Sequence, residues 1–373
     1  MEDLVKLFAG IYSGKRVLLT GHTGFKGGWL ALWLRELGAT VCGYSLAPEG
    51  EETLFELLPG DLFADSTIAD IRDADGMRRA IRDCRPDIIF HLAAQPIVGI
   101  SYRDPMDTFT SNTLGTAILL ESVRAERCGA AIVIVTSDKC YRNDNAGRAF
   151  VETDPLGGND VYSMSKAVAE LVTASWHASF FSKDDSLGPM GTGRAGNVIG
   201  GGDYAEDRIV PDAVRAHQSG EALLLRNPGA TRPWQHVLES VSGYLALGRR
   251  LLSRPEKDTL LNYNFGPNPE SVRSVRDLVD SWLTVWPDAF PVEALGHATY
   301  AEAARLSLDP AKAKEELGWI PVWAFERTVQ ETARWYQARH ADGADAVAMR
   351  ELTRRQINDY TNDAALAGVT WTR

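Results

Sequence analysis

Short runs of aliphatic residues alternate with amphipathic segments over residues 15–198. The runs at 17–19, 88–90 and 132–135 are too short for helices and are flanked mostly by polar residues, which is typical of strands buried on both faces of a sheet. A parallel sheet covered by helices produces this alternation of strands and helices. We therefore predict an α/β fold built on a Rossmann-type doubly wound parallel sheet.

The first predicted strand leads into a helix. Apolar residues recur at helical spacing over residues 29–37, and Gly38 follows them as a C-cap, so the start of the chain predicts a strand, a turn and a helix. After Gly200 the elements become shorter and richer in Pro and Gly, which indicates a less regular lobe. Residues 308–313 are typical of a helix start, and residues 328–339 predict a surface helix.

This change of pattern divides the chain into two predicted parts. We expect residues 1–195 to form a Rossmann domain, with some later segments returning to it. Residues 196–373 should form mainly a smaller C-terminal substrate-binding lobe. A chain of 373 residues with 45% hydrophobic content is long enough for a large core and too long for one small domain.

The chain is acidic, with a formal net charge of −11 at pH 7. Like charges repel over the whole of such a surface, which argues against a nucleic-acid partner and against binding to an anionic membrane. Any phosphate that the protein binds must therefore contact a region where the local charge is positive, unlike the protein as a whole.

The spacing of the cysteines and the N-terminal sequence indicate where in the cell the protein works. The chain has no paired spacing among its four cysteines, Cys42, Cys84, Cys128 and Cys140, which fits reduced thiols better than a disulfide framework. The same spacing argues against structural zinc, and we predict that the protein binds no metal. Residues 1–14 contain a short apolar run that predicts a short helix and lacks the long hydrophobic segment of a signal peptide. No stretch approaches the roughly eighteen apolar residues needed to cross a bilayer, so we expect a cytoplasmic protein.

A glycine-rich turn follows the first predicted strand and opens the first helix. Residues 20–27 read TGHTGFKG. Gly21, Gly24 and Gly27 stand where a tight turn, close approach to a pyrophosphate and helix-on-strand packing each exclude a Cβ, and the helix N-terminus supplies oriented N–H donors. We interpret the segment as a dinucleotide-binding turn; the alternative is a glycine-rich turn that only packs.

The residues around this turn bear on which dinucleotide would bind. Tyr44 and Ser45 occupy the place where an acidic residue usually holds the adenosine ribose, and no arginine is present there for a 2′-phosphate, so we favour NAD over NADP. Asp70 and Ile71, at the end of the third strand, are candidates for contact with the adenine edge, although Asp70 would serve equally well as a helix N-cap. The small residues within 92–94 let a dinucleotide lie close to the fourth strand.

Tyr162 and Lys166 are four residues apart on one face of a predicted helix. A fixed cation near a phenol favours the phenolate, so we expect Lys166 to lower the pKa of Tyr162 from about 10. Tyr162 would then accept a proton from a sugar hydroxyl while a hydride leaves the same carbon for a nicotinamide. Such pairs are also common on helix surfaces, and it is the glycine turn upstream that favours the catalytic interpretation.

Ser137, Asp138 and Lys139 follow the predicted fifth strand and therefore lie at the carboxyl edge of the sheet, where doubly wound folds bind ligands. Ser137 would hydrogen-bond the same hydroxyl as Tyr162. Asp138 and Lys139 would place an acid and a base beside the oxidised sugar, which a simple dehydrogenase does not require. The alternative is a solvated Asp–Lys pair in a loop.

These features together resemble the extended short-chain dehydrogenase/reductase superfamily. Within it, four segments spread over roughly residues 10–340 resemble the CDP-glucose 4,6-dehydratases, a family of nucleotide-sugar dehydratases. Long strings of specific residues match by accident far less often than any single motif does. The four segments are residues 21–27 (GHTGFKG), 136–141 (TSDKCY), 194–203 (RAGNVIGGGD) and 232–237 (RPWQHV).

The resemblance implies a redox-neutral dehydration of CDP-D-glucose to CDP-4-keto-6-deoxy-D-glucose. Tyr162 would take the 4-hydroxyl proton as tightly bound NAD accepts hydride from C4; water would leave across C5 and C6, and hydride would return to C6. Related sugar dehydratases carry an Asp–Glu pair as acid and base where this chain has Asp138 and Lys139. Lys139 would serve as the C5 base only with a depressed pKa, or alternatively as a cation that stabilises the enolate.

The resemblance also implies binding residues. Gln95, Asn197 and Arg232 match positions that contact the substrate, and a guanidinium such as that of Arg232 suits bidentate contact with a diphosphate. The implied cofactor residues are Gly21, Thr23, Gly24, Phe25, Lys26, Gly27, Asp70, Ile71, Leu92, Ala93, Ala94, Tyr162 and Lys166.

One departure from the family concerns the fold. Residues 188–193 contain more glycine and proline than a buried strand tolerates well, which predicts a shifted or shortened sixth strand.

The resemblance also implies an oligomer. The family expectation is a homodimer or a dimer of dimers, formed through helices at 112–127 and 162–181.

Other functions remain open at this point. A nucleotide-sugar 4-epimerase shares Tyr162, Lys166 and the glycine turn but needs no acid/base pair for elimination. A 4,6-dehydratase for another nucleotide sugar is equally open, because no short motif encodes the base. A cofactor-sensing binding module would keep the fold without turnover.

Overall fold

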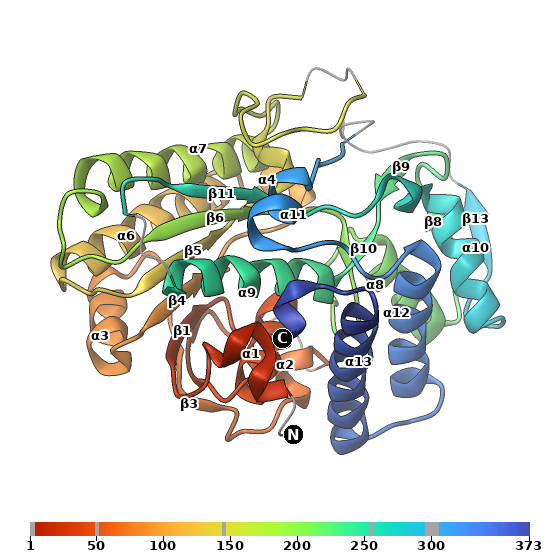
Figure 1. Ribbon diagram of the computed structural model, residues 1–373. Helices are drawn as coiled ribbons and strands as arrows, with labels where there is room; N and C mark the ends of the chain where they lie inside the picture. Colours follow the sequence, from red (N-terminus) through yellow and green to blue (C-terminus); the bar gives the residue numbers. More distant parts are fainter. Residues whose placement is uncertain (1–3, 49–51, 144–146, 254–256, 295–305) are drawn as a thin grey trace.

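A seven-stranded, all-parallel sheet forms the centre of the molecule, in the order β11-β6-β5-β4-β1-β2-β3 (Figure 1). The order reverses between β1 and β4, which confirms the predicted Rossmann-type doubly wound sheet. The strands are β1 (Arg16–Thr20), β2 (Thr40–Ser45), β3 (Phe63–Ile68), β4 (Ile88–His91), β5 (Ala131–Val135), β6 (Met190–Arg194) and β11 (Leu261–Asn264). This computed structural model describes residues 4–48, 52–143, 147–253, 257–294 and 306–373.

Helices cover both faces of the sheet. Along β5, Val133 packs into the core beneath α1 and α9, whereas Ile132 and Ile134 pack into the core beneath α3 and α6. Burial on both faces explains why these strands read as continuous apolar runs. The covering helices are α1 (Phe25–Glu36) and α9 (Val237–Ser253) on one face, and α3 (Ala74–Cys84), α6 (Gly115–Ala125) and α7 (Val161–Trp176) on the other.

The sheet is accompanied by a second group of elements that lies beyond its carboxyl edge and includes short strand pairs (Figure 1). The pairs are β7 (Val198–Ile199) with β10 (Gln235–His236), β9 (Thr231–Pro233) with β12 (Val272–Ser274), and β8 (Leu223–Leu225) with β13 (Val292–Ala294). The helices of this group are α8 (Ile209–Ser219), α10 (Val275–Val285), α12 (Phe325–His340) and α13 (Ala346–Leu366).

Shorter helical segments connect these elements. Two of them, η2 and η4, have π-helical hydrogen bonding and are continuous with α6 and α7 respectively. The remaining segments are α2 (Leu54–Leu57), α4 (Val98–Arg103), α5 (Pro105–Phe109), α11 (Ala311–Leu317), η1 (Leu4–Gly10), η2 (Thr110–Leu114), η3 (Asp138–Cys140), η4 (His177–Phe181), η5 (Pro269–Ser271) and η6 (Thr370–Thr372).

Two local expectations need correction. The N-terminal helix is only a 3₁₀ segment, because Phe8 and Ala9 take left-handed backbone angles that seat Phe8 against Trp371, with ring centroids 4.9 Å apart. The sixth strand is not shortened: β6 has five residues, as β1 and β5 do, and is buried throughout. Its glycines permit close pairing, since a Cβ on Gly191 would lie 2.6 Å from the carbonyl oxygen of Leu261 on β11.

The two helices predicted near the C-terminus are present as α11 and α12.

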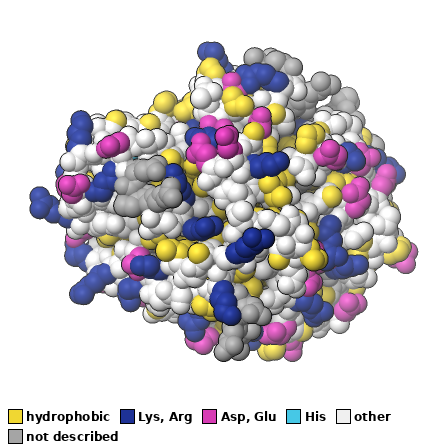
Figure 2. All heavy atoms as spheres, in the orientation of Figure 1, with side chains coloured by type: hydrophobic (Ala, Val, Ile, Leu, Met, Phe, Trp, Pro, Cys, Tyr) yellow, Lys and Arg dark blue, Asp and Glu magenta, His cyan; other side chains and the backbone are white. Residues whose placement is uncertain are grey.

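The surface carries charges of both signs. Figure 2 shows Lys and Arg side chains interspersed with Asp and Glu on the face drawn there. No helix within the described parts of the chain is long and apolar enough to span a membrane. Among the same residues, no group of three or more His, Cys, Asp and Glu side chains is arranged to hold a metal ion.

A buried ion pair joins the sheet to α7. Arg194, at the end of β6, places its Nη2 2.8 Å from Oε2 of Glu170, and both side chains are 2% exposed. Glu170 also accepts hydrogen bonds from Thr136 and Thr192, and Arg194 donates to Tyr141 Oη at 2.7 Å. The pair therefore braces β6 and the segment after β5, through Thr136, against the helix that carries Tyr162.

Replacing Arg194 with methionine should lower the free energy of unfolding by about 3–5 kcal/mol, because it leaves the Glu170 carboxylate buried without its countercharge. Urea unfolding followed by circular dichroism measures this change. As a control, Lys15→Met removes a partly exposed pair with Asp87 and should cost less than about 1 kcal/mol. Equal losses in the two variants would contradict a structural role for the buried pair.

Candidate active site

A cavity of about 970 Å³ opens at the carboxyl edge of the sheet, between the strands and the second group of elements. Every residue that the sequence nominated for catalysis, cofactor or substrate lines this one cavity. They come from the β1–α1 turn, the ends of β3, β4 and β5, helix α7, and the segments around β7 and β9. The fold thus brings together motifs more than 200 residues apart.

The glycine turn allows two backbone segments to come into contact. Gly21 has a φ of +78°, and a Cβ on it would lie 2.7 Å from the backbone nitrogen of Ala93 at the end of β4. A Cβ on Gly27 would lie 2.0 Å from the carbonyl oxygen of Gly21. Helix α1 begins directly after Gly24, so its first N–H groups face the cavity without a side-chain cap. This cradle fits the pyrophosphate of a dinucleotide.

The other residues of the turn have separate roles. Thr23 places its Oγ1 2.9 Å from Ser45 Oγ and donates to the Leu46 carbonyl, which ties the turn to the end of β2. Lys26 points toward α9, where its Nζ donates to Tyr244 Oη at 3.3 Å. Burial, with the charge of Arg208 nearby, lowers the pKa of Lys26 to about 7.

Tyr162 and Lys166 lie in the first turns of α7, which Asp160 caps by accepting from the N–H of Ser163. The expected lowering of the tyrosine pKa is wrong for this structure. Burial raises the pKa of Tyr162 to about 12, although a hydrogen bond with Ser137 and the charge of Arg208 act in the opposite direction. Burial also lowers the pKa of Lys166 to about 8, against the opposing effects of Cys140 and Glu170.

Asp138 lies at the first position of η3, directly beyond β5, with only 2% of its surface exposed. Ser137 Oγ donates to Asp138 Oδ1 at 2.9 Å, and Asn197 Nδ2 donates to Oδ2 at 3.3 Å. Burial raises the pKa of Asp138, against the opposing effect of Lys139. A Cβ on Gly196 would lie 2.0 Å from Asp138 Oδ2, so the motif around Asn197 needs glycine to make room for this carboxyl.

The three predicted substrate residues differ in their surroundings. Gln95 lines the cavity, but its side chain is already bonded within the protein: Nε2 donates to Thr108 Oγ1 at 2.6 Å and Oε1 accepts from the N–H of Ile97. Asn197 takes a left-handed backbone conformation with a φ of +50° beside Asp138. Arg232, on β9, lines the cavity, and its guanidinium donates to the carbonyl of Thr231.

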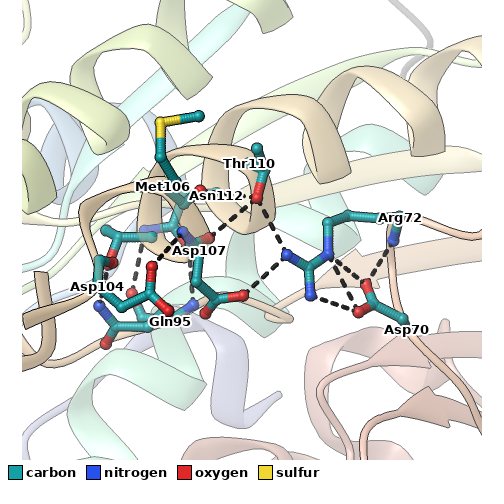
Figure 3. A network of polar contacts seen from close by, with 9 residues as sticks. Asp70, Arg72, Gln95, Asp104, Met106, Asp107, Thr110 and Asn112 are labelled. Carbon is teal, nitrogen blue, oxygen red and sulfur yellow. Dashed lines mark hydrogen bonds and ion pairs between the residues drawn. The ribbon is translucent and has the colours of Figure 1, made fainter.

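Asp70 is not a helix N-cap. That role belongs to Asp73, whose side chain accepts from the N–H of Gly76 at the start of α3. Asp70 lines the cavity and is paired with Arg72, whose Nη2 lies 2.6 Å from Asp70 Oδ2 (Figure 3). The Arg72 guanidinium holds the pKa of Asp70 below its ordinary value, so this carboxylate is ionised and can only accept hydrogen bonds.

Sequence reasoning missed Arg208. This residue lines the cavity just before α8 and places its Nη1 2.8 Å from Asp203 Oδ2, and its charge acts on both Tyr162 and Lys26. The preceding residue, Asp207, has a φ of +58°. No spacing rule relates this loop to α7, so the chain offered no local signal for the contact.

Comparison with known proteins now adds to this geometry. Residues 18–260 match the family described as GDP-mannose 4,6 dehydratase. The chain is also 42% identical over 353 residues, 94% of its own length and 97% of its relative's, to the CDP-glucose 4,6-dehydratase of Salmonella typhimurium.

The chain belongs to the nucleotide-sugar 4,6-dehydratase family. Two solved structures have the same fold as this dehydratase. The UDP-glucose 4-epimerase of Brucella ovis, in complex with NAD, superimposes with a TM-score of 0.73 at 22% identity, over 87% of this chain and 98% of the other. The dTDP-glucose 4,6-dehydratase of Bacillus anthracis, also in complex with NAD, superimposes with a TM-score of 0.70 at 21% identity. This superposition covers 87% of this chain and 97% of the other.

Replacing Gly27 with alanine should weaken dinucleotide binding to the dehydratase about ten- to a hundredfold, because the new methyl group would push α1 away from the Gly21 carbonyl. Isothermal titration with NAD measures the loss. Gly229→Ala is the matched control: Gly229 also lines the cavity, but its Cβ would meet nothing within 4 Å. Wild-type affinity in Gly27→Ala would argue against the glycine cradle as the pyrophosphate site.

Proposed function

We propose that the protein is an NAD-dependent lyase that dehydrates CDP-D-glucose to CDP-4-keto-6-deoxy-D-glucose. The observation that carries the proposal is the placement of Asp138 and Lys139 in the same cavity as Ser137 and Tyr162. Oxidation and reduction of a sugar need only the hydroxyl groups of Ser137 and Tyr162 beside the cofactor. Loss of water needs an additional acid and an additional base. The identity of 42% to the Salmonella typhimurium enzyme supports CDP-glucose as the substrate.

NAD fits the cavity as its cofactor. The uncapped N-terminus of α1 and the cradle at Gly21 and Gly27 suit its pyrophosphate. Among the described residues at the carboxyl end of β2, Ser45 lines the cavity and no basic side chain is present for a 2′-phosphate. When bound, the nicotinamide would accept a hydride from C4 of the sugar and later return it to C6. We propose that the part formed by residues 1–195 holds this cofactor and that residues 196–373 hold mainly the sugar nucleotide.

The first chemical task for the protein is to remove the proton of the 4-hydroxyl. Tyr162 is the acceptor, Ser137 hydrogen-bonds the same oxygen, and Lys166 stands one helical turn further along α7. Because burial raises the pKa of Tyr162 to about 12, this phenol holds its proton tightly in the described state, and positive charge close to its oxygen favours the phenolate. Arg208 acts on the phenol in this direction, and Lys166 lines the same cavity.

The second task is elimination across C5 and C6. Burial keeps the Asp138 carboxyl protonated to a higher pH than usual, so it is suited to donate a proton to the departing C6 hydroxyl. Lys139 lies next to it and removes the C5 proton, which the new C4 ketone has made acidic. The alternative role for Lys139 is to stabilise the enolate by its charge alone.

The remaining cavity residues hold the substrate. Arg232 and Asn197 offer donors for the diphosphate, and Gln95 lines the same cavity as a further substrate contact. These contacts provide local positive charge and donors within an acidic protein.

A dimer is proposed through α6 and α7. The exposed apolar side chains on and next to these helices include Leu114, 46% exposed, and Leu171, 55% exposed. Burying such groups against a second copy would extend the two helices into a four-helix contact.

Incubation of the purified protein with CDP-glucose should yield a 4-keto-6-deoxy sugar without net NADH, because hydride taken from C4 is returned to C6. The alkaline absorbance of the keto product and the absorbance of NADH are followed together, with dTDP-glucose and GDP-mannose as controls. Product from a control sugar alone would overturn the choice of CDP-glucose. Accumulating NADH would indicate a plain dehydrogenase, and interconversion of sugars without keto product would indicate an epimerase.

Replacing Lys139 with arginine should lower turnover about 10²- to 10⁴-fold, because a guanidinium keeps the positive charge but does not deprotonate to act as a base. Single-turnover mixing should then show reduced nicotinamide formed without elimination. Lys139→Gln, which loses both charge and base, is the comparison. Near-wild-type dehydration by Lys139→Arg together with a slow Lys139→Gln would assign Lys139 to enolate stabilisation instead.

A further inference from the structure

A buried glutamine, Gln235, lies behind the part of the cavity wall that contains Gly196 and Asn197. It belongs to β10, and none of its surface is exposed. Gly196 and Asn197 line the cavity, whereas Gln235 is outside the lining that the described residues form. Any effect of Gln235 on a bound substrate must therefore pass through the residues in front of it.

Gln235 donates to two consecutive carbonyl groups in that wall. Its Nε2 lies 2.8 Å from the Gly196 carbonyl oxygen, and its backbone nitrogen lies 3.3 Å from the Asn197 carbonyl oxygen. Nε2 also donates to the carbonyl of Phe265 at 3.1 Å, just beyond β11. The backbone N–H of Phe265 in turn donates to the carbonyl of Arg194 at 2.8 Å. The amide thus ties the turn after β6 to the end of β11.

Both residues that Gln235 holds lie against the Asp138 carboxyl. Asn197 Nδ2 donates to Asp138 Oδ2 at 3.3 Å, and a Cβ on Gly196 would lie 2.0 Å from the same oxygen. Asn197 has a φ of +50°, a left-handed conformation that costs free energy in a non-glycine residue and persists where neighbouring bonds fix it. A shift of this turn would therefore disturb the position of the carboxyl.

Packing alone does not account for an amide at this position. The described residues offer Oε1 of Gln235 no hydrogen-bond partner, and burying an unpaired polar atom costs free energy. An apolar side chain of similar size, such as methionine, would fill the same space without that cost. It would lack the Nε2 donor, however, and the two groups that face Nε2 are carbonyl oxygens, which only a donor can satisfy.

We propose that Gln235 is a positioning residue for the elimination step: by holding Gly196 and Asn197, it keeps the Asp138 carboxyl where it can donate a proton to the departing C6 hydroxyl. The inference rests on the proposed dehydratase function and adds to it a residue outside the cavity. Oxidation at C4 uses Tyr162 on α7 instead, so the two chemical steps should respond differently to a change at Gln235.

Single-turnover mixing of the NAD-loaded protein with CDP-glucose separates the two steps, because reduced nicotinamide forms on oxidation at C4 and decays only after elimination. In Gln235→Met, its formation should stay within about threefold of the wild-type rate, whereas its decay should slow about ten- to a hundredfold, since a small misplacement of a catalytic group costs up to that much. Gln235→Glu, whose protonated form can donate to one carbonyl, should slow the decay less. Adding Gln235→Met to Asp138→Asn should slow the decay no further, because both changes act through the same carboxyl group.

Gln356→Met is the matched control. Gln356, on α13, is 1% exposed, and its Nε2 donates to the carbonyl of Glu331 on α12 at 2.8 Å. It is outside the cavity lining that the described residues form. This variant therefore loses a comparable buried donor, and it should keep both rates at the wild-type values.

Equal slowing of formation and decay in Gln235→Met would overturn the inference, as would further slowing when this change is added to Asp138→Asn. If Gln235→Met does not fold, Gln235→Glu takes its place, and a wild-type rate of decay in it would have the same consequence. Wild-type protein that gave no keto product from CDP-glucose would overturn this inference and the proposed function together. Keto product from the wild-type protein, with an unchanged decay in Gln235→Met, would overturn this inference alone.

Discussion

Removal of charged groups from water at the carboxyl edge of the sheet governs the chemistry of this site. Burial raises the pKa of Asp138 and of Tyr162 and lowers the pKa of Lys26 and of Lys166. Each shift favours the neutral form of the group, as expected where a charged side chain is removed from water.

This environment depends on the close packing of backbone at the same edge. Gly27 lets α1 approach the Gly21 carbonyl, and Gly196 leaves room for the Asp138 carboxyl; a single Cβ at either position would lie 2.0 Å from an oxygen atom. The Arg194–Glu170 pair then braces β6 and α7 from inside the sheet. Packing of this kind excludes water, and the exclusion of water produces the pKa shifts, so the fold and the chemistry have one physical origin.

The sequence predicted the buried strands and the glycine turn, because each of these depends on residues that are close together in the chain. Strands such as Ile88–His91 read as apolar runs because both faces are covered, and the glycine turn was recognised because steric limits act on neighbouring residues. Arg208 was missed because its contacts depend on where a distant loop folds back. The pKa of Tyr162 was predicted in the wrong direction for a related reason: the distance along the helix to Lys166 was visible, but the burial of both groups was not.

The segment between β4 and α6 connects the two ends of the cavity. Its α5 helix presents Asp107 beside Arg72, and a few residues later Asn112 bonds to Ser165, directly before Lys166 on α7. One short stretch of chain thus contacts both the cavity wall next to β3 and the helix that carries Tyr162. Because side-chain hydrogen bonds anchor it at both places, this segment fixes that wall of the cavity relative to α7.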